Sequence, residues 1–310
     1  MNRVNSTSHL AERMAARLKD VSLPGTSALF GGEVPVEAPS LDTVSPAVHP
    51  SSPYAGIVPE PQREAFARSA DHEKTISIKT LEDAGMASFG GHRDRVGEEF
   101  RIARQHVMQT MATADASVPH RNLVMVTSSR PGEGKSFAAL NLAAALAEGS
   151  GRQVLLVDAD MRDRSLSRLL GFADDPGLLD LDMSPSQTIR TAVIPSSLDN
   201  LAFLPLGGSA GNGTTRAVAM PGNPVSALLE HVASYFRDSI VVVDVPACLA
   251  DSDPAAFAPI VGQIVLVVEA GRTRRREVES ALDLLDVCPH ISLLLNKVSS
   301  YGSGLFGAYS

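Results

Sequence analysis

The sequence predicts an α/β fold, a three-layer sandwich with a mainly parallel sheet at its centre. Between about residues 94 and 300, short apolar runs of strand length alternate with segments whose apolar residues recur at helical spacing. The apolar runs show no polar alternation, which is typical of strands buried on both faces. A glycine-rich turn joins the first run to a helix. Strands that alternate with helices predict right-handed crossovers and a parallel sheet.

The first 93 residues are predicted to lie outside this domain and to be mostly disordered. A short amphipathic helix is expected over residues 9–19, where Leu10, Met14 and Leu18 recur at four-residue spacing. After it, eight prolines interrupt any regular element, at Pro24, Pro35, Pro39, Pro46, Pro50, Pro53, Pro59 and Pro61. This composition predicts a flexible linker without a packed core.

The predicted domain spans residues 94–300 and begins with a helix over 94–112, where Phe100, Ala103 and Val107 share one face. The strands predicted after it are Leu123–Thr127, Val154–Val157, Leu201–Leu204, Ile240–Val243, Ile264–Val268 and Ile291–Leu295. The helices predicted between them are Lys135–Ala147, Pro224–Arg237 and Arg276–Val287. Residues 301–310 are rich in glycine and serine and are predicted to form a flexible tail.

The strongest functional signal is the segment Ser129–Ser136, which reads Ser-Arg-Pro-Gly-Glu-Gly-Lys-Ser. It follows a predicted strand and opens a predicted helix, which is the context of a phosphate-binding P-loop. The glycines let backbone N–H groups turn inward, and the helix N-terminus adds its positive dipole end. Lys135 can reach the β- and γ-phosphates of ATP, and Ser136 can ligate Mg²⁺. The residues predicted to hold the nucleotide here are Arg130, Pro131, Gly132, Glu133, Gly134, Lys135 and Ser136, with Ser129 in place of the usual first glycine.

Carboxylates follow two further predicted strands. Asp158 and Asp160 come after the strand at 154–157, and Asp244 comes after the strand at 240–243. The carboxyl ends of parallel strands meet at the edge where such sheets bind ligands. We therefore expect Ser136, Asp160 and Asp244 to hold Mg²⁺. Lys135, Asp158 and Asp160 are the expected catalytic residues, with Asp158 accepting a proton from the attacking hydroxyl.

Together these motifs resemble the bacterial tyrosine kinases of capsule and exopolysaccharide synthesis, which belong to the wider class of Min/Par-type ATPases. The matches are Pro131–Ser136, the Asp158-x-Asp160-x-Arg162 motif and the Asp244-x-Pro246 motif, within a resemblance over about Glu98–Lys297. The resemblance implies phosphoryl transfer from ATP to tyrosine with Mg²⁺, in which the Asp-x-Asp motif takes part. It also implies that Asn296 lies against the adenine ring.

A further match lies on the helix before the first strand, where Glu98, Arg101 and Arg104 form E-x-x-R-x-x-R. The resemblance implies that this segment mediates a ring-like homo-oligomer in which each subunit presents its tyrosine tail to a neighbour. The alternative is an intrahelical Glu98–Arg101 pair on a solvated face. The tail carries Tyr301 and Tyr309 as candidate autophosphorylation sites, fewer than the dense cluster of typical members.

The sequence therefore predicts a protein-tyrosine autokinase that regulates the polymerisation and export of exopolysaccharide or capsule. The resemblance implies a separate membrane-embedded polysaccharide copolymerase, or chain-length regulator, as its activating partner. Two alternatives remain open. One is a Min/Par-type ATPase switch with water as the acceptor. The other is a nucleotide-dependent scaffold of the export complex with little kinase activity, which the sparse tyrosines favour.

Composition excludes other classes of protein. A formal charge of −8 and a pI near 5.5 argue against nucleic acid as the main partner, because duplex-binding proteins show a basic stripe. Cys248 and Cys288 lie in apolar stretches without metal-ligand spacing, as expected for reduced thiols in the cytoplasm. No apolar run approaches the ~20 residues of a membrane span. The protein is predicted to be cytoplasmic and recruited to the inner face of the plasma membrane by its partner.

Overall fold

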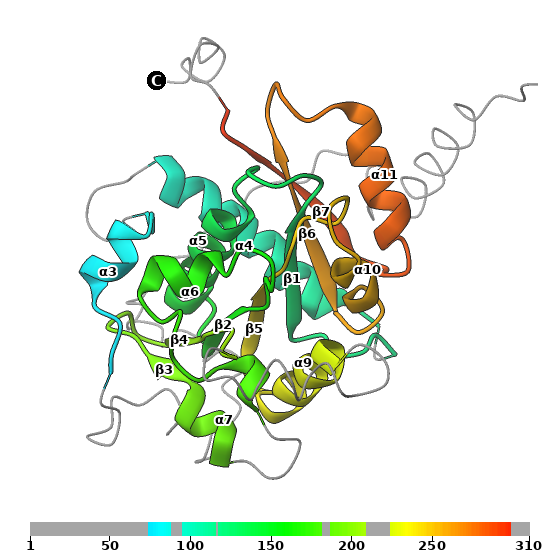
Figure 1. Cartoon of the computed structure of the whole chain (residues 1–310). Coiled ribbons are helices and arrows are strands. Elements are labelled where there is room, and N and C mark those ends of the chain that lie inside the picture. The colour runs from blue at the N-terminus through cyan, green and yellow to red at the C-terminus, as the bar shows by residue number, and fades with distance from the viewer. Residues whose placement is uncertain (1–73, 88–94, 116, 182–186, 209–223, 299–310) are drawn as a thin grey trace, which may run out of the picture. The chain divides into compact units, whose positions relative to one another are not determined.

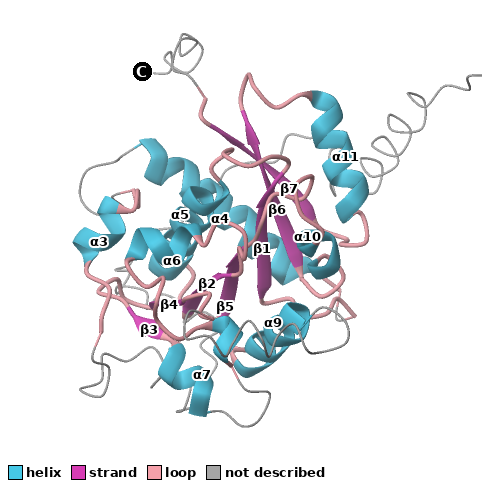
Figure 2. Cartoon of the chain, in the orientation of Figure 1, coloured by secondary structure: helices cyan, strands magenta, loops and turns pink. Residues whose placement is uncertain are grey.

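The computed structural model describes residues 74–87, 95–115, 117–181, 187–208 and 224–298 (Figure 1). The chain divides into two compact units, Met1–Ser51 and Ser52–Ser310, and every described residue belongs to the second. In this unit helices lie on both faces of one sheet (Figure 2). The predicted α/β sandwich is therefore confirmed.

Seven strands form the sheet in the order β3-β4-β2-β5-β1-β6-β7. They are β1 (Leu123–Ser128), β2 (Val154–Asp158), β3 (Ile194–Pro195), β4 (Leu201–Leu204), β5 (Ile240–Asp244), β6 (Gln263–Glu269) and β7 (Ile291–Asn296). All neighbouring pairs are parallel except β3 and β4. Each predicted strand begins and ends within one residue of an observed one. The short β3 was not predicted, because two residues carry no periodic pattern.

Helices form the two outer layers of the sandwich. One layer contains α3 (Ile78–Asp83), α4 (Arg95–Thr113), α5 (Lys135–Gly149) and α6 (Ser165–Leu170). The other contains the 3-10 turn η1 (Leu178–Asp180), α7 (Gln187–Ala192), α9 (Pro224–Tyr235), α10 (Asp253–Phe257) and α11 (Arg275–Leu285). Successive side chains of the central strands enter opposite layers, as Val124 and Met125 do. The strand order brings the carboxyl ends of β1, β5 and β2 side by side.

The edge strand β7 departs from the prediction that every apolar strand is buried. Leu293 and Leu295 are 58% and 60% exposed, whereas β1, β2 and β5 are buried throughout. β7 is the last strand of the sheet, and among the described strands it has a neighbour, β6, on one side only. Ile291 and Leu294 pack against the core, whereas the apolar character of Leu293 and Leu295 is not explained by contacts within the described part of the chain.

The folded domain also begins earlier than the predicted boundary at residue 94. Ile76 is buried, and its N–H donates to the carbonyl of Pro195 in β3. Leu81 of α3 is buried as well, and the side chain of Asn141 in α5 accepts a hydrogen bond from the N–H of Ala87. Residues 74–87 thus belong to the domain, and a segment this short gives no clear sequence pattern. The predicted helix at 9–19 and the predicted tail at 301–310 lie outside the described residues.

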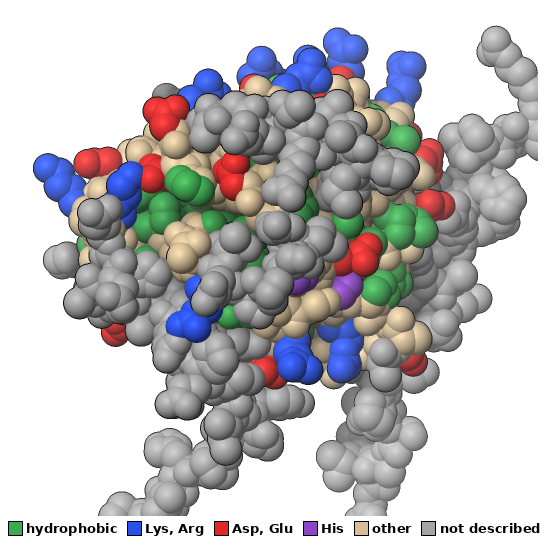
Figure 3. Space-filling model, turned by 60° about the horizontal axis from the view of Figure 1, so that its bottom comes forward, with side chains coloured by type: hydrophobic (Ala, Val, Ile, Leu, Met, Phe, Trp, Pro, Cys, Tyr) green, Lys and Arg blue, Asp and Glu red, His purple; other side chains and the backbone are tan. Residues whose placement is uncertain are grey.

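No helix in the described part of the chain is long and apolar enough to cross a membrane. Figure 3 shows one face of the molecule, on which Lys and Arg side chains are interspersed with Asp and Glu over the described surface.

Candidate nucleotide-binding site

The P-loop is the turn from β1 into α5, residues 129–134. Gly132 and Gly134 have φ values of 85° and 93°, in the left-handed region that glycine adopts without a steric penalty. A Cβ atom on Gly134 would also lie 2.2 Å from Nδ2 of Asn296. Gly134 is the N-cap of α5, and no side chain caps the first turn of that helix. The loop therefore has the open cradle that an anion such as phosphate requires.

Lys135 opens α5 and lies among three carboxylates. Its side chain is buried, and Nζ forms an ion pair with Asp160 and lies 3.7 Å from Oδ1 of Asp244. Burial alone would lower the pKa of Lys135, but the charges of Asp244, Asp160 and Asp158 outweigh burial and raise the pKa above its usual 10.5. The lysine is thus held in its charged form next to the P-loop.

Asp244 ends β5 and lies in register with Asp158 at the end of β2. It is fully buried, and among the described residues neither of its carboxylate oxygens accepts a hydrogen bond. Burial raises the pKa of Asp244 to about 7, against the opposing charge of Lys135. The Ser136 hydroxyl is near enough to favour the ionised form without reaching hydrogen-bond distance. A buried carboxylate in this state is costly unless a cation reaches it.

The donor set at this position fits Mg²⁺ bound together with a nucleotide. The Ser136 hydroxyl lies 2.7 Å from the Ser165 hydroxyl, and among the described residues neither oxygen of Asp244 has a hydrogen bond. Within the described residues, no group of three or more His, Cys, Asp or Glu side chains is arranged to hold a metal by itself. Mg²⁺ usually binds through one or two carboxylates plus substrate phosphates and waters. Asp244 and Ser136 match that requirement.

The carboxylate of Asp160 accepts hydrogen bonds both from the turn after β2 and from Lys135. Oδ1 of Asp160 accepts hydrogen bonds from the N–H groups of Arg162 and Asp163, each at 3.0 Å, while Oδ2 faces Lys135. These bonds fix the carboxylate against rotation. Asp160 therefore presents one oxygen toward the phosphate cradle.

Both oxygens of Asp158 are engaged. Oδ2 accepts from the N–H and the hydroxyl of Ser167 at 2.8 and 2.7 Å, and Oδ1 accepts from the N–H of Asp160 at 3.0 Å. Burial raises the pKa of Asp158, and the bonds from Ser167 oppose the rise. The structure brings Asp158 into the cluster as predicted. Its hydrogen bonds favour a role in positioning the start of α6 over the predicted role of proton acceptor.

Residues at the carboxyl end of β7, together with Thr273, contact the P-loop. Nδ2 of Asn296 donates to the carbonyl of Glu133 at 2.9 Å, and Nζ of Lys297 donates to the carbonyl of Gly132 at 2.6 Å. The Glu133 carboxylate accepts a hydrogen bond from the Thr273 hydroxyl. Asn296, predicted to contact adenine, is thus placed beside the nucleotide site and touches the loop itself.

Arg130 was predicted to be one of the residues that hold the nucleotide. One guanidinium nitrogen lies 3.3 Å from Oε1 of Glu277 in α11, and the arginine side chain is half exposed. Arg130 therefore sits at the surface against α11, with its side chain away from Lys135.

Three hydroxyl residues of the site were not predicted from the sequence. The Ser165 hydroxyl contacts the Ser136 hydroxyl. The hydroxyls of Ser167 and Thr273 donate hydrogen bonds to the carboxylates of Asp158 and Glu133, respectively. A Ser-x-Ser pair just after the Asp-x-Asp motif could have indicated the first two. Thr273 lies 140 residues from its partner, and no local pattern links them.

Glu98, Arg101 and Arg104 lie on α4, away from the P-loop. Nη1 of Arg101 forms an ion pair with Glu98 on the same helix. Nη1 of Arg104 lies 3.3 Å from the carbonyl of Ala145 near the end of α5, in space that a Cβ on Gly149 would fill. Each charged group therefore has a contact within its own chain. The predicted autophosphorylation sites Tyr301 and Tyr309 lie outside the described residues.

We expect Gly134→Ala to weaken ATP binding at least about tenfold. Left-handed strain costs a non-glycine residue about 1–2 kcal/mol, and 1.4 kcal/mol corresponds to tenfold in affinity; the clash with Asn296 adds to it. Gly151→Ala is the matched control, because Gly151 has φ 68° but open space around its Cβ position and lies outside the site. Titration with a fluorescent ATP analogue measures both. Equal affinities for the two variants would contradict the role of Gly134.

Comparison with known proteins agrees with this geometry. The ParA family model, described as NUBPL iron-transfer P-loop NTPase, matches residues 120–286, more than half of the chain. The succinoglycan biosynthesis transport protein ExoP of Rhizobium meliloti is 31% identical over 222 residues, which cover 70% of this chain and 27% of ExoP. The tyrosine-protein kinase YwqD of Bacillus subtilis is 29% identical over 221 residues, covering 66% of this chain and 84% of YwqD.

Among solved structures, the VpsO kinase domain is 27% identical with a TM-score of 0.51, covering 66% of this chain and 96% of that domain. The kinase domain of the Escherichia coli tyrosine kinase ETK shares the fold, with a TM-score of 0.55 at 23% identity over 76% of this chain and 91% of that domain. The present chain spans between 21% and 27% of the length of three longer relatives, ExoP among them. The predicted resemblance to bacterial tyrosine kinases is confirmed by relatives that carry this name, and the chain belongs to the ParA family of P-loop NTPases.

Proposed function

We propose that this chain is an ATP-dependent protein-tyrosine kinase that phosphorylates tyrosines on a second copy of itself. The observation that supports the proposal is the buried pair of Lys135 and Asp244 at the P-loop, where a charged lysine faces a carboxylate whose oxygens accept no hydrogen bond from the described residues. This arrangement suits a phosphate together with its cation. Relatives of the chain are named tyrosine-protein kinases.

The reaction breaks the bond between the γ-phosphorus of ATP and its bridging oxygen. A new bond forms between that phosphorus and the tyrosine oxygen, whose proton passes to solvent, and ADP leaves with the bridging oxygen. The turn 129–134 and Lys135 hold the phosphates and offset the charge that spreads over the γ-phosphoryl oxygens. Ser136, Asp160 and Asp244 would hold Mg²⁺, which supplies further neutralisation of phosphate charge when bound. Asp158 positions Asp160 through the turn that both residues share.

The acceptors we assign are Tyr301 and Tyr309, and Arg104 with its neighbours on α4 is the surface through which copies associate. The activating partner we propose is a membrane-embedded polysaccharide copolymerase, a separate polypeptide that recruits the chain to the membrane. Relatives named for succinoglycan transport and for tyrosine kinases support this context.

A mixing experiment tests the proposal. One protein carries Lys135→Met and an intact tail, and the other carries Tyr301→Phe and Tyr309→Phe with an intact site. With ATP and Mg²⁺, we expect phosphotyrosine on the tail of the Lys135→Met protein in the mixture and none in either protein alone. Mass spectrometry of the two tails reads the result.

Three other outcomes decide against it. Phosphate on the Lys135→Met protein alone would show that Lys135 is dispensable. ATP hydrolysis without phosphotyrosine, in the unmodified protein with the cytoplasmic part of a copolymerase, would favour an ATPase switch. Nucleotide binding without either reaction would favour a scaffold.

A further inference from the structure

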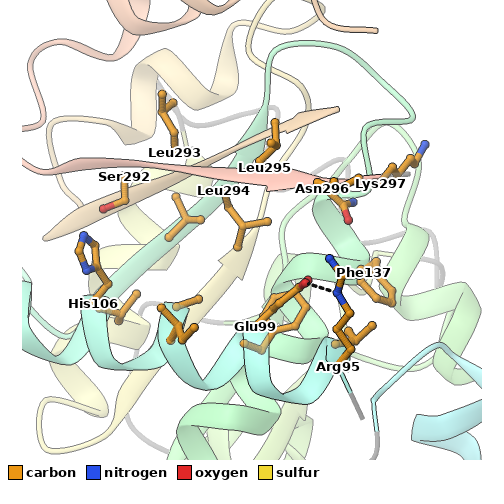
Figure 4. Close-up of a pocket in the computed structure, with 17 residues that line it drawn as sticks. Arg95, Glu99, His106, Phe137, Ser292, Leu293, Leu294, Leu295, Asn296 and Lys297 are labelled. Atoms are coloured by element: carbon orange, nitrogen blue, oxygen red, sulfur yellow. Dashed lines mark hydrogen bonds and ion pairs between the residues drawn. The ribbon is translucent and has the colours of Figure 1, made fainter. Parts of the chain in front are cut away.

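A groove of about 700 Å³ runs along the outer edge of the sheet, between α4 and β7 (Figure 4). Apolar side chains line most of it, and several are unusually exposed. Ile102 of α4 is 69% exposed, Leu293 and Leu295 of β7 are 58% and 60% exposed, and Val298 is 53% exposed. An exposed apolar strip of this kind on an edge strand marks a surface that binds another segment of polypeptide.

The backbone of β7 has a free edge along this groove. The N–H of Ile264 donates to the carbonyl of His290, and the N–H of Ala270 donates to the carbonyl of Asn296. Since parallel ladders use every second residue, the even-numbered residues of β7 bond to β6. The N–H and C=O groups of Leu293 and Leu295 therefore face outward. Among the described strands, none lies on that side.

The two sides of this edge are both apolar. Figure 4 shows Ser292 and Leu294 directed toward α4, while Leu293 and Leu295 lie on the opposite side of the strand. Successive side chains of a strand point to opposite faces. A peptide added to β7 would therefore need large apolar side chains at adjacent positions to cover Ile102 on one side and the two leucines on the other.

We propose that residues 299–310 of this same chain bind in the groove as an antiparallel strand against β7. The segment begins directly after Val298, which itself lines the groove. It carries no charged residue, and it offers the adjacent apolar pair Leu305 and Phe306. Gly302 and Gly304 precede that pair and supply the residues that a tight reversal of the chain favours.

Strand length agrees with this assignment. Residues 305–310 number as many as the six residues of β7. Eight residues, 297–304, then connect β7 to the proposed strand, which is more than the ~2–5 residues of most hairpin loops. A segment tethered at the end of its own site also has an effective concentration in the millimolar range, because closing a short loop costs little entropy. A second copy of the chain would have to bind the same edge without that advantage.

The proposed binding of residues 299–310 to β7 does not require that the chain transfers phosphate. If it is combined with the proposed function, on which this one consequence rests, a bound tail holds Tyr301 and Tyr309 at their own subunit. Release of the tail from the groove would then precede its phosphorylation by a neighbour.

Hydrogen exchange of the full chain tests the proposal. We expect the amides of Leu293 and Leu295 to exchange at least about fivefold faster in a Leu305→Asp/Phe306→Asp variant than in the unmodified chain, because the variant loses the strand that accepts hydrogen bonds from these amides. Ser299→Asp/Ser303→Asp is the matched control, since it adds the same charge outside the proposed strand. The amides of Ser292 and Leu294, which bond to β6, are the internal reference.

A groove variant tests the same contact from the other side. Ile102→Asp is expected to produce the same faster exchange at Leu293 and Leu295, whereas Val287→Asp, at an exposed position beyond α11, is not. Protection that is equal in all variants would overturn the proposal. Protection that falls on tenfold dilution would also overturn it, and would assign the edge to a second copy.

Discussion

Lys135→Met is expected to reduce phosphoryl transfer to tyrosine by at least about 10³-fold, the scale seen when a group that stabilises transition-state charge is removed. Lys135 is the only described cation whose Nζ lies among the three carboxylates of the site, and its raised pKa keeps it charged. Methionine preserves the length of the side chain and removes the charge. The loss should appear in the turnover rate more than in the affinity for ATP, because the backbone of residues 129–134 still binds phosphate.

The same substitution is expected to destabilise the protein by about 3 kcal/mol, since it leaves buried carboxylates without their cation. A lysine with a raised pKa stabilises the fold below pH 10.5 and loses that effect only above its folded pKa. The destabilisation should therefore be present throughout the neutral range. Urea unfolding of Lys135→Met and of the exposed control Lys79→Met measures it. A transfer rate within tenfold of the unmodified protein would contradict the assigned role.

The central part of the site could be predicted from the sequence because its geometry follows from strand ends. Asp158 and Asp244 directly follow apolar runs, and Lys135 follows the loop 129–134 after another apolar run. Parallel strands bring such positions to one edge. The sequence around each strand is therefore sufficient to predict that these residues lie at one edge of the sheet. It does not predict the order of the strands, which places Asp244 between Lys135 and Asp158.

The contacts that link distant segments could not be predicted in the same way. Thr273 reaches Glu133, and Asn296 reaches the carbonyl of the same residue, from loops that are far away in the sequence. Periodicity indicates that a side chain is apolar or polar, but it does not indicate its partner. For the same reason the apolar run of β7 predicted a buried strand, although Leu293 and Leu295 are exposed on the described surface.

Asp244→Asn is expected to stabilise the protein by roughly 2–4 kcal/mol at pH 8, measured without nucleotide or divalent cation, and by a smaller amount, about 1.5 kcal/mol, at pH 5. Burial raises the pKa of Asp244 from 3.8 to about 7, and each pKa unit is worth about 1.4 kcal/mol. In this pH range the folded state binds the proton more tightly than the unfolded state does. The stability of the unmodified protein should therefore fall as the pH rises from about 4 to 7.

Asparagine removes that penalty, because it presents a neutral group of the same shape. Urea unfolding at pH 5 and pH 8 measures the difference, with Asp283→Asn on the exposed side of α11 as the control for removing one negative charge. Stabilisation that is equal at both pH values would show that Asp244 does not titrate in the folded protein. A loss of stability at pH 8 would show that its charge is balanced by Lys135.

The gain in stability of Asp244→Asn should be accompanied by a loss of catalysis. The negative charge of Asp244 destabilises the fold, but the same charge is needed to bind a cation. Asp244→Asn is expected to lower phosphotyrosine formation at least about 10²-fold at saturating ATP, a loss of about 3 kcal/mol in the transition state. Raising the Mg²⁺ concentration should restore part of the rate, because the amide oxygen is a weaker ligand than a carboxylate. An Asp244→Asn protein that is more stable and equally active would place the metal ligand elsewhere. A protein that is more stable and inactive would identify Asp244 as a residue kept for catalysis at the expense of the fold.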